Sequence, residues 1–277
     1  ASACSACKPD RGTVMSESAF TSETDAQGVA RLTLNRVGVH NAFDDHLIEA
    51  LTRELVRIGL DTRVRVLVLA ANGKTFSAGA DLNWMGRMAG YSREQNLADA
   101  HGLATLLSTW DTLPQPVVGR IHGAAFGGGV GLVSCCDIAI ATEAATFCLS
   151  EVRLGLIPAV ISPYVVNAMG LRHARRYCVS AERFDAGEAL RVGLVHEVVA
   201  DEALDRRVCE CVADLLANGP KAMAAAKDLL RAVARGPLDS AMIADTAKRI
   251  ADIRVGEEGR EGIAAFLGKR GPAWTER

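Results

Sequence analysis

The residues best suited to chemistry lie in a glycine-rich stretch, residues 119–136, which reads GRIHGAAFGGGVGLVSCC. An extended run ends near Ile121, and three glycines, Gly127, Gly128 and Gly129, then lead into small apolar residues, which predicts a strand turning sharply into a buried helix. Glycine lets another molecule approach the main chain closely, and the first turn of a helix presents unpaired N–H groups. The stretch therefore predicts a site for negative charge or, alternatively, close packing of a helix on a strand.

Two nucleotide-binding motifs do not fit this stretch. A GxGxxG fingerprint fails in either frame, because Leu132 or Ser134 stands where its last glycine should be. A phosphate-binding loop fails as well, since no lysine follows these glycines, and the separate GKT at residues 73–75 has Val68 in place of the first glycine.

A second turn of small residues, SAGAD at residues 77–81, directly follows an apolar run. Asp81 is suited to cap a following helix, so the turn is either an ordinary strand-to-helix connection or a place where the main chain is open to a ligand. Further along, Glu151 has an apolar neighbourhood. Its carboxylate either forms an ion pair with Arg153 or Arg175, or is partly desolvated so that its pKa rises towards a useful range.

The elements that must position these groups follow an α/β order. Residues 29–35 alternate as a half-buried strand does, and residues 64–71 form an apolar run typical of a strand buried on both faces. Between them Asp44 begins a helix whose apolar residues recur at helical spacing, namely Leu47, Ile48, Leu51, Leu55 and Ile58. This order predicts a parallel crossover unit.

The rest of the chain extends the α/β pattern and then becomes helical. Strands are predicted at 137–141, 145–149 and 194–199, and helices at 92–113, 160–169, 185–192, 202–218, 220–234, 238–255 and 256–269. The composition changes near Ala200, so we expect an α/β core over 15–200 and a helical region over 201–277. Residues 1–14 are interpreted as a leader or an expression remnant, with Met15 as a natural start.

Composition excludes several classes of protein. The 277 residues carry a net charge of −2 with dispersed basic residues, which argues against nucleic acid as a partner. Because no apolar run is long enough to cross a membrane and no secretory segment is present, we expect a soluble, cytoplasmic protein.

The cysteines do not indicate a metal or a disulfide framework. Four of the eight, Cys135, Cys136, Cys148 and Cys178, have apolar surroundings typical of reduced core residues. The CxxC at residues 4–7 and the CxC at residues 209–211 lack further ligands at zinc-site spacing, so no metal is expected.

Taken in order, six motifs resemble the crotonase family, also called the enoyl-CoA hydratase/isomerase family. They are HNAF at 40–43, FSAGADL at 76–82, PVVGRIHGAAFGGGVGL at 116–132, CDIAIA at 136–141, FCLSEVRLGLIP at 147–158 and AFLGKRGPAW at 265–274. The resemblance covers nearly everything after about residue 29. It implies an α/β fold of repeated ββα units around two nearly perpendicular sheets, with a C-terminal helical region used in forming trimers or pairs of trimers.

The resemblance also implies a reaction. Members bind acyl-CoA thioesters and stabilise an enolate, so the N–H groups of Ala80 and Gly128 would form an oxyanion hole and Glu151 would move the proton. Further substrate contacts are expected from Ala78, Asp81, Leu82, Gly127, Gly131, Arg153, Phe266 and Lys269, the last two towards the nucleotide and often from a neighbouring subunit. No separate cofactor is expected, because coenzyme A is part of the substrate.

One departure from the hydratase pattern is informative. The second hydratase glutamate would fall at position 131, where this chain has Gly131. A single carboxylate is typical of Δ3,Δ2-enoyl-CoA isomerases. The amino-acid sequence around the glycine-rich stretch and Glu151, however, resembles that of methylglutaconyl-CoA and isohexenylglutaconyl-CoA hydratases. Their substrates carry a second carboxylate, for which Arg153 is a possible clamp. We therefore expect a methylglutaconyl-CoA hydratase. The alternatives are a Δ3,Δ2-enoyl-CoA isomerase, an isohexenylglutaconyl-CoA hydratase, and a non-catalytic member that binds acyl-CoA or RNA.

Overall fold

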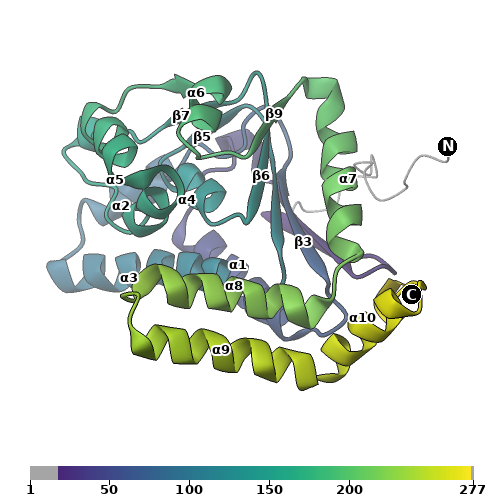
Figure 1. Cartoon of the computed structure of the whole chain (residues 1–277). Helices are drawn as coiled ribbons and strands as arrows, with labels where there is room; N and C mark the ends of the chain where they lie inside the picture. Colours follow the sequence, from purple (N-terminus) through teal and green to yellow (C-terminus); the bar gives the residue numbers. More distant parts are fainter. Residues whose placement is uncertain (1–17, 276–277) are drawn as a thin grey trace.

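A computed structural model describes residues 18–275, so the interpretation of residues 1–14 lies outside the described residues (Figure 1). The larger sheet has six strands in the order β1-β2-β3-β4-β6-β9. Their bounds are β1 Phe20–Thr24, β2 Val29–Leu34, β3 Val66–Ala71, β4 Val117–Ile121, β6 Ile138–Thr142 and β9 Glu197–Val199. Only the β1–β2 pair is antiparallel, and the parallel β2–β3 pair confirms the predicted crossover unit.

A smaller sheet lies beside the glycine-rich stretch. Its strands are β5 Ala124–Phe126, β7 Thr146–Cys148 and β8 Phe184–Asp185, in that order. Strand β5 was not predicted, because its three residues lie between glycines and are too few to show a period. This short strand separates β4 from the helix α4, Gly128–Ser134, so the predicted sharp turn contains an extra strand.

Helix α1, Asp45–Leu60, shows how directly the apolar pattern specifies the core. Asp44 caps it by accepting a hydrogen bond from the Leu47 N–H, at 2.8 Å. All five apolar residues predicted to face inward are buried. Helix α1 packs against α3, Arg93–Asp111, on the side of the large sheet that holds the main hydrophobic core.

The opposite face of the large sheet is covered by helix α7, Leu204–Leu216, which Figure 1 shows alongside β3 and β6. Buried residues of α7, including Val208 and Val212, share a second apolar cluster with Val66 and Val118 of the sheet. The helical region that begins after Ala200 therefore contributes its first long helix to the α/β core.

Three further C-terminal helices follow, and basic side chains of the first one, α8, attach it to the core. They are α8 Pro220–Arg235, α9 Ser240–Val255 and α10 Glu257–Leu267. Lys227 pairs with Asp137 at 2.6 Å, and Arg231 donates to the Asp111 carbonyl at 2.8 Å. Figure 1 shows α8 and α9 side by side, with α10 at the far end of this layer.

Three further helices complete the described fold: α2 Leu82–Met88, α5 Ser162–Ser180 and α6 Ala186–Arg191. Helix α5 extends well past the predicted end at residue 169, although Gly170 interrupts it with φ 73° and ψ 156°. Strand β1 was not predicted, because its FTSET sequence has one large apolar residue and lies at a sheet edge. Within residues 18–275, no helix is both long and apolar enough to cross a membrane.

Candidate active site

The SAGAD turn presents the Ala80 N–H to solvent. Phe43 forms a parallel bridge with Ala80, in which the Phe43 N–H donates to the Gly79 carbonyl at 2.7 Å and the Asp81 N–H donates to the Phe43 carbonyl at 2.8 Å. In such a bridge the N–H of the central residue points away from its partner. Among residues 18–275 the Ala80 N–H has no protein acceptor, and Ala80 itself is exposed.

A polar network holds this turn in place. Arg36 pairs with Asp44 at 2.8 Å and with Asp81 at 3.1 Å, and it also donates to the Ala42 carbonyl at 2.6 Å. Asp81 is buried and caps helix α2 by accepting from the Asn83 and Trp84 N–H groups. Its structural partners therefore account for its carboxylate, and its predicted substrate contact stays a proposal.

The second turn presents the N–H of Gly128. Gly127 has a positive φ of 50°, which glycine adopts without strain, and its N–H donates to the Cys148 carbonyl at 2.9 Å. Gly128 begins helix α4, where an N–H has no intrahelical acceptor. In the part of the chain that the structure describes, no other acceptor lies within hydrogen-bond distance of this N–H.

The two turns meet directly. The Ser77 N–H donates to the Ala124 carbonyl at 3.0 Å, and the Phe126 N–H donates to the Ser77 carbonyl at 2.9 Å. A Cβ added to Gly79 would lie 2.9 Å from the Phe126 carbonyl oxygen and 3.7 Å from Gly127 Cα. Only glycine at position 79, which also has φ 88°, allows this approach.

The carboxylate of Glu151 lies beside these turns. Glu151 begins a 3₁₀ helix, Glu151–Leu154, separated from the end of β7 by two residues, and a Cβ on Gly127 would lie 3.2 Å from Glu151 Oε1. Its Oε2 is buried and has no hydrogen-bond partner within residues 18–275. Burial raises the pKa of the Glu151 carboxyl above its ordinary value, against a smaller lowering by its own backbone N–H.

The alternative interpretation of Glu151, an ion pair with Arg153 or Arg175, is wrong. No salt bridge of Glu151 occurs in the described residues. Arg153 instead donates from Nη2 to the Ala181 carbonyl at 2.6 Å, at the left-handed residue that ends α5. This leaves the Glu151 carboxylate free to exchange a proton with a ligand.

The space that a second glutamate would need at position 131 is occupied by Ile161, the residue before helix α5. Gly131 is buried in α4, and a Cβ added there would lie 2.5 Å from Ile161 Cγ2 and 3.7 Å from Leu107 Cδ1. Since even a methyl group would collide with Ile161, a glutamate at this position would require the α4–α5 contact to open. The packing around Gly131 therefore leaves no room for a glutamate at this position.

The other predicted binding residues divide into two groups. Ala78 and Leu82 are exposed beside the Ala80 turn, and the Leu82 side chain is 82% accessible. Phe266 and Lys269 lie in or just after α10, which contacts α8 and α9. Figure 1 shows α10 at the opposite end of the molecule from α2 and α4, so one chain does not bring these two residues to Glu151.

Three residues that shape the site were not identified from the sequence: Arg36, Phe43 and Ile161. Arg36 and Phe43 lie in the loop between β2 and α1. The bridge joins Phe43 to Ala80, 37 positions away, and the ion pair joins Arg36 to Asp81, 45 positions away. Phe43 belongs to the HNAF motif, which was the available signal. Nothing local marks Ile161, because its contact with Gly131 depends on how α4 and α5 pack.

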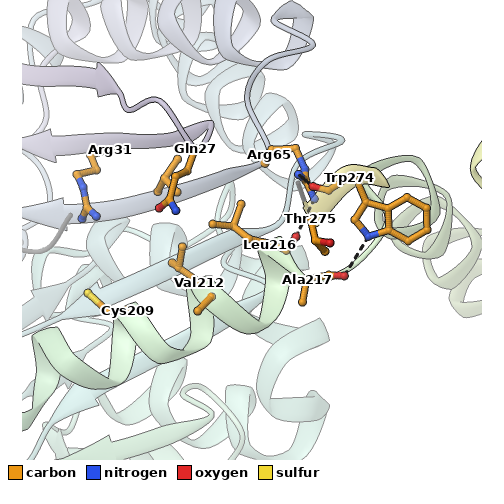
Figure 2. Close-up of a pocket in the computed structure, with 11 residues that line it drawn as sticks. Gln27, Arg31, Arg65, Cys209, Val212, Leu216, Ala217, Trp274 and Thr275 are labelled. Atoms are coloured by element: carbon orange, nitrogen blue, oxygen red, sulfur yellow. Dashed lines mark hydrogen bonds between the residues drawn. The ribbon is translucent and has the colours of Figure 1, made fainter. Parts of the chain in front are cut away.

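A separate pocket of about 350 Å³ lies elsewhere (Figure 2). Its lining includes Arg31, Arg65, Val212 and Trp274. Arg65 precedes β3, whereas the Ala80 turn follows β3, so the pocket and the turns lie at opposite ends of that strand. The Arg65 guanidinium donates to main-chain carbonyls of Leu216, Asn218 and Trp274, which gives it a structural role.

Together, two free N–H groups beside one unpaired carboxylate can stabilise an oxyanion and transfer a proton next to it. Comparison with known proteins agrees with this chemistry. The sequence model of the Enoyl-CoA hydratase/isomerase family matches residues 24–277. An enoyl-CoA hydratase crystal structure from Shewanella pealeana is 49% identical with a TM-score of 0.90, and the match covers 93% of this chain and 96% of that one.

Curated relatives extend this comparison. The 2,3-dehydroadipyl-CoA hydratase of Escherichia coli K12 is 32% identical over 259 residues, 91% of this chain and 96% of that protein. The enoyl-CoA hydratase ACTT6 of Alternaria alternata is 33% identical over 253 residues, 90% of this chain and 82% of that protein. The chain has the crotonase fold and belongs to the enoyl-CoA hydratase/isomerase family.

Proposed function

We propose that this enzyme adds water across the α,β double bond of a branched enoyl-CoA that carries a second carboxylate, with methylglutaconyl-CoA as the substrate and leucine breakdown as the setting. The observation that carries the proposal is the single unpaired carboxylate of Glu151 beside the free N–H groups of Ala80 and Gly128. The amino-acid sequence of the glycine-rich motif and of the motif around Glu151 supports methylglutaconyl-CoA as the substrate.

The proposed mechanism uses the two backbone donors first. The thioester oxygen accepts hydrogen bonds from the N–H groups of Ala80 and Gly128. As Glu151 takes a proton from water, the water oxygen adds to the β-carbon, and the π electrons move to the thioester oxygen to give an enolate. The enolate then collapses and its α-carbon takes the proton from Glu151. Fixed donors stabilise the enolate without reorganising, and each is worth about 3 to 4 kcal/mol in the transition state.

The raised pKa of Glu151 suits this task. A carboxyl whose pKa lies closer to the working pH is a better proton acceptor from water and still releases the proton to carbon. Burial is the cause of the rise, and no cation in the described residues pairs with the carboxylate to oppose it. The steps need only Glu151 and main-chain groups, so we propose no cofactor beyond the coenzyme A of the substrate.

The second carboxylate of the substrate is proposed because the protein supplies only one. Because Ile161 occupies the space of a side chain at position 131, we propose that a substrate carboxylate helps to hold the attacking water. A relative named for 2,3-dehydroadipyl-CoA supports this class, since adipyl thioesters also end in a free carboxylate. Arg153 is proposed to bind that carboxylate with the guanidinium nitrogens other than Nη2, which donates to Ala181.

We also propose a cytoplasmic homotrimer or pair of trimers. Large apolar side chains are exposed along α8 to α10, including Leu230 at 66%, Val255 at 62% and Phe266 at 84%. Burying such a surface between subunits is favourable, and it would allow Phe266 and Lys269 to reach a neighbour's nucleotide site. Sedimentation or light scattering measures the assembly, and a monomer at micromolar concentration would contradict this proposal.

A second candidate, a Δ3,Δ2-enoyl-CoA isomerase, is favoured by the same single carboxylate, because one base can take a proton from one carbon and return it to another. The experiment offers methylglutaconyl-CoA, crotonyl-CoA and a 3-enoyl-CoA and follows the conjugated thioester absorbance. We expect the fastest turnover with methylglutaconyl-CoA. Turnover of the 3-enoyl substrate alone would establish the isomerase, and retained acyl-CoA binding with no turnover of any substrate would indicate a binding protein.

A further inference from the structure

We propose that Phe43 is a positioning residue that sets the spacing between the two oxyanion donors. The inference rests on the oxyanion hole of the proposed function and adds the residue that links its two halves. Phe43 does not touch the reacting atoms in this account, since it acts through Ala80 and Gly128.

The backbone of Phe43 fixes the first donor. Its N–H donates to the Gly79 carbonyl at 2.7 Å and its carbonyl accepts from the Asp81 N–H at 2.8 Å. These two hydrogen bonds hold the peptides on either side of Ala80. The direction of the Ala80 N–H is therefore set by the position of Phe43.

The ring of Phe43 limits the position of the second donor. A Cβ built on Gly128 would lie 3.3 Å from Phe43 Cδ2 and 3.4 Å from Cε2, and no other described side chain comes within 4 Å of it. A side chain at Gly128 would meet the ring more tightly than ordinary van der Waals packing allows, so the ring lies beside Gly128 and fills the space that a Cβ would take. The ring is buried, with 3% of Phe43 accessible.

The loop that carries Phe43 is itself firmly held. Asn41 is 1% exposed, and its side chain donates to the carbonyls of Asn72 at 2.9 Å and Thr75 at 2.8 Å. Arg36 ties the same loop to Asp81. Because the loop cannot shift easily, the Phe43 ring is a rigid spacer between the two turns.

Spacing matters because a single oxygen must accept both hydrogen bonds. Each N–H has to lie about 2.7–3.1 Å from the oxyanion, so movement of one turn weakens one of the two bonds. Misplacement of about 1 Å can cost about 100-fold in rate. Replacing the Phe43 ring with a smaller side chain should therefore reduce turnover much more than it reduces substrate binding.

The test is a double-mutant cycle of Phe43→Leu and Gly128→Ala, assayed with methylglutaconyl-CoA. We expect Phe43→Leu to lower kcat about 10- to 100-fold with KM changed less than about threefold. Gly128→Ala should also lower kcat, because its methyl group meets the ring. The double variant should be at least as active as Gly128→Ala alone, since the smaller side chain makes room for the methyl group. If the loss of kcat in the double variant equals the product of the two single-variant losses, the proposal is overturned.

Binding of two thioesters separates positioning from general damage. Acetoacetyl-CoA ionises to an enolate, whereas butyryl-CoA does not. Phe43→Leu should weaken acetoacetyl-CoA about tenfold and butyryl-CoA less than twofold, and equal weakening would contradict the proposal. Leu51→Ala is the matched control, because Leu51 is fully buried in the same core, on α1, and should lower the melting temperature without changing kcat.

The outcomes also distinguish this proposal from the proposed function. If the wild-type enzyme turns over none of the three thioesters, the hydratase proposal fails first and the positioning role fails with it. If the wild type is active and loses activity with Glu151→Gln while the cycle is multiplicative, the function stands and only the role of Phe43 is wrong. A variant that unfolds is identified by circular dichroism, and Phe43→Met then repeats the cycle.

Discussion

The two turns that carry the proposed oxyanion donors, Ala80 and Gly128, are built differently. The Ala80 turn is held by charged and polar side chains, with Asp81 receiving Arg36 and two backbone N–H groups. Among residues 18–275 the Gly128 turn has no charged side-chain partner, and it is held by the Gly127 N–H bond to the Cys148 carbonyl and by close packing of glycines. At Gly129 an added Cβ would lie 2.9 Å from the Ser77 carbonyl oxygen, and at Gly131 it would lie 2.5 Å from Ile161.

The difference shows two ways to preorganise a backbone donor. Polar side chains hold a turn through hydrogen bonds and ion pairs of defined geometry, and removing one of them leaves its buried partner unsatisfied. Glycines hold a turn because neighbouring atoms pack directly against the main chain, and adding any side chain there would disrupt this packing. Beside this packed turn, Glu151 Oε2 has no hydrogen-bond partner in the described residues, and burial raises the pKa of the Glu151 carboxyl.

The largest expected effect on stability comes from adding a methyl group to the packed turn. Gly131→Ala should lower the free energy of unfolding by about 3 kcal/mol, because overpacking forces α4 and α5 apart. Chemical denaturation measures the loss. Ile161→Leu, which removes the branch at Cβ, should recover part of it in the double variant. Gly86→Ala is the matched control in α2, since an added Cβ there has no described neighbour within 4 Å. Equal behaviour of the two alanine variants would contradict the packing account.

Removing the cation of the polar turn should have a smaller effect on stability. Arg36→Met leaves Asp81, which is 5% exposed, without its charged partner, so we expect a loss of about 2 kcal/mol and roughly tenfold lower kcat. Denaturation and steady-state assays measure the two effects. The exposed pair Arg53–Glu49 gives the control, because Arg53→Met should cost less than about 1 kcal/mol. If both variants lose the same stability, the Arg36 network does not hold the turn.

Substitution of Arg153, the cation nearest in sequence to Glu151, should alter substrate preference. Arg153→Met should lower kcat/KM for methylglutaconyl-CoA about tenfold relative to crotonyl-CoA, a difference of about 1.4 kcal/mol. Crotonyl-CoA serves as the internal control because it has no second carboxylate. An unchanged ratio between the two substrates would remove Arg153 as the carboxylate clamp.

The smallest expected effect concerns stability rather than rate. Because burial raises the pKa of Glu151, the folded protein binds this proton more tightly than the unfolded chain does. The wild type therefore loses stability as pH rises through the raised pKa, and Glu151→Gln does not. Melting temperatures should show the glutamine variant more stable at pH 7 to 8, with the difference vanishing below about pH 4. A pH-independent difference would show that Glu151 is not desolvated.

Much of the fold was predictable because its signals are local. Helix α1 and its cap at Asp44 follow from apolar spacing, and the buried strand β3 follows from an uninterrupted apolar run. Strand β5 was missed, since three residues between glycines carry no period. Helix α5 was predicted too short, because Gly170 reads as a helix end although the chain resumes helical geometry after it.

The candidate site residues could be predicted from the sequence, but the contacts that hold them in place could not. Ala80, Gly128 and Glu151 follow from motifs, and the structure brings their turns together. The ion-pair alternative for Glu151 could be rejected only in three dimensions, where Arg153 turns to the Ala181 carbonyl. Likewise, the contact of Ile161 with Gly131 joins positions 30 residues apart through helix packing, which no local pattern encodes.

The most direct test of the account is turnover of methylglutaconyl-CoA by wild type and Glu151→Gln, measured by conjugated thioester absorbance at pH 7 to 8. The account predicts that glutamine, which is similar in size and cannot transfer the proton, lowers kcat about 1,000-fold with KM nearly unchanged. Full activity of the Glu151→Gln enzyme would contradict it.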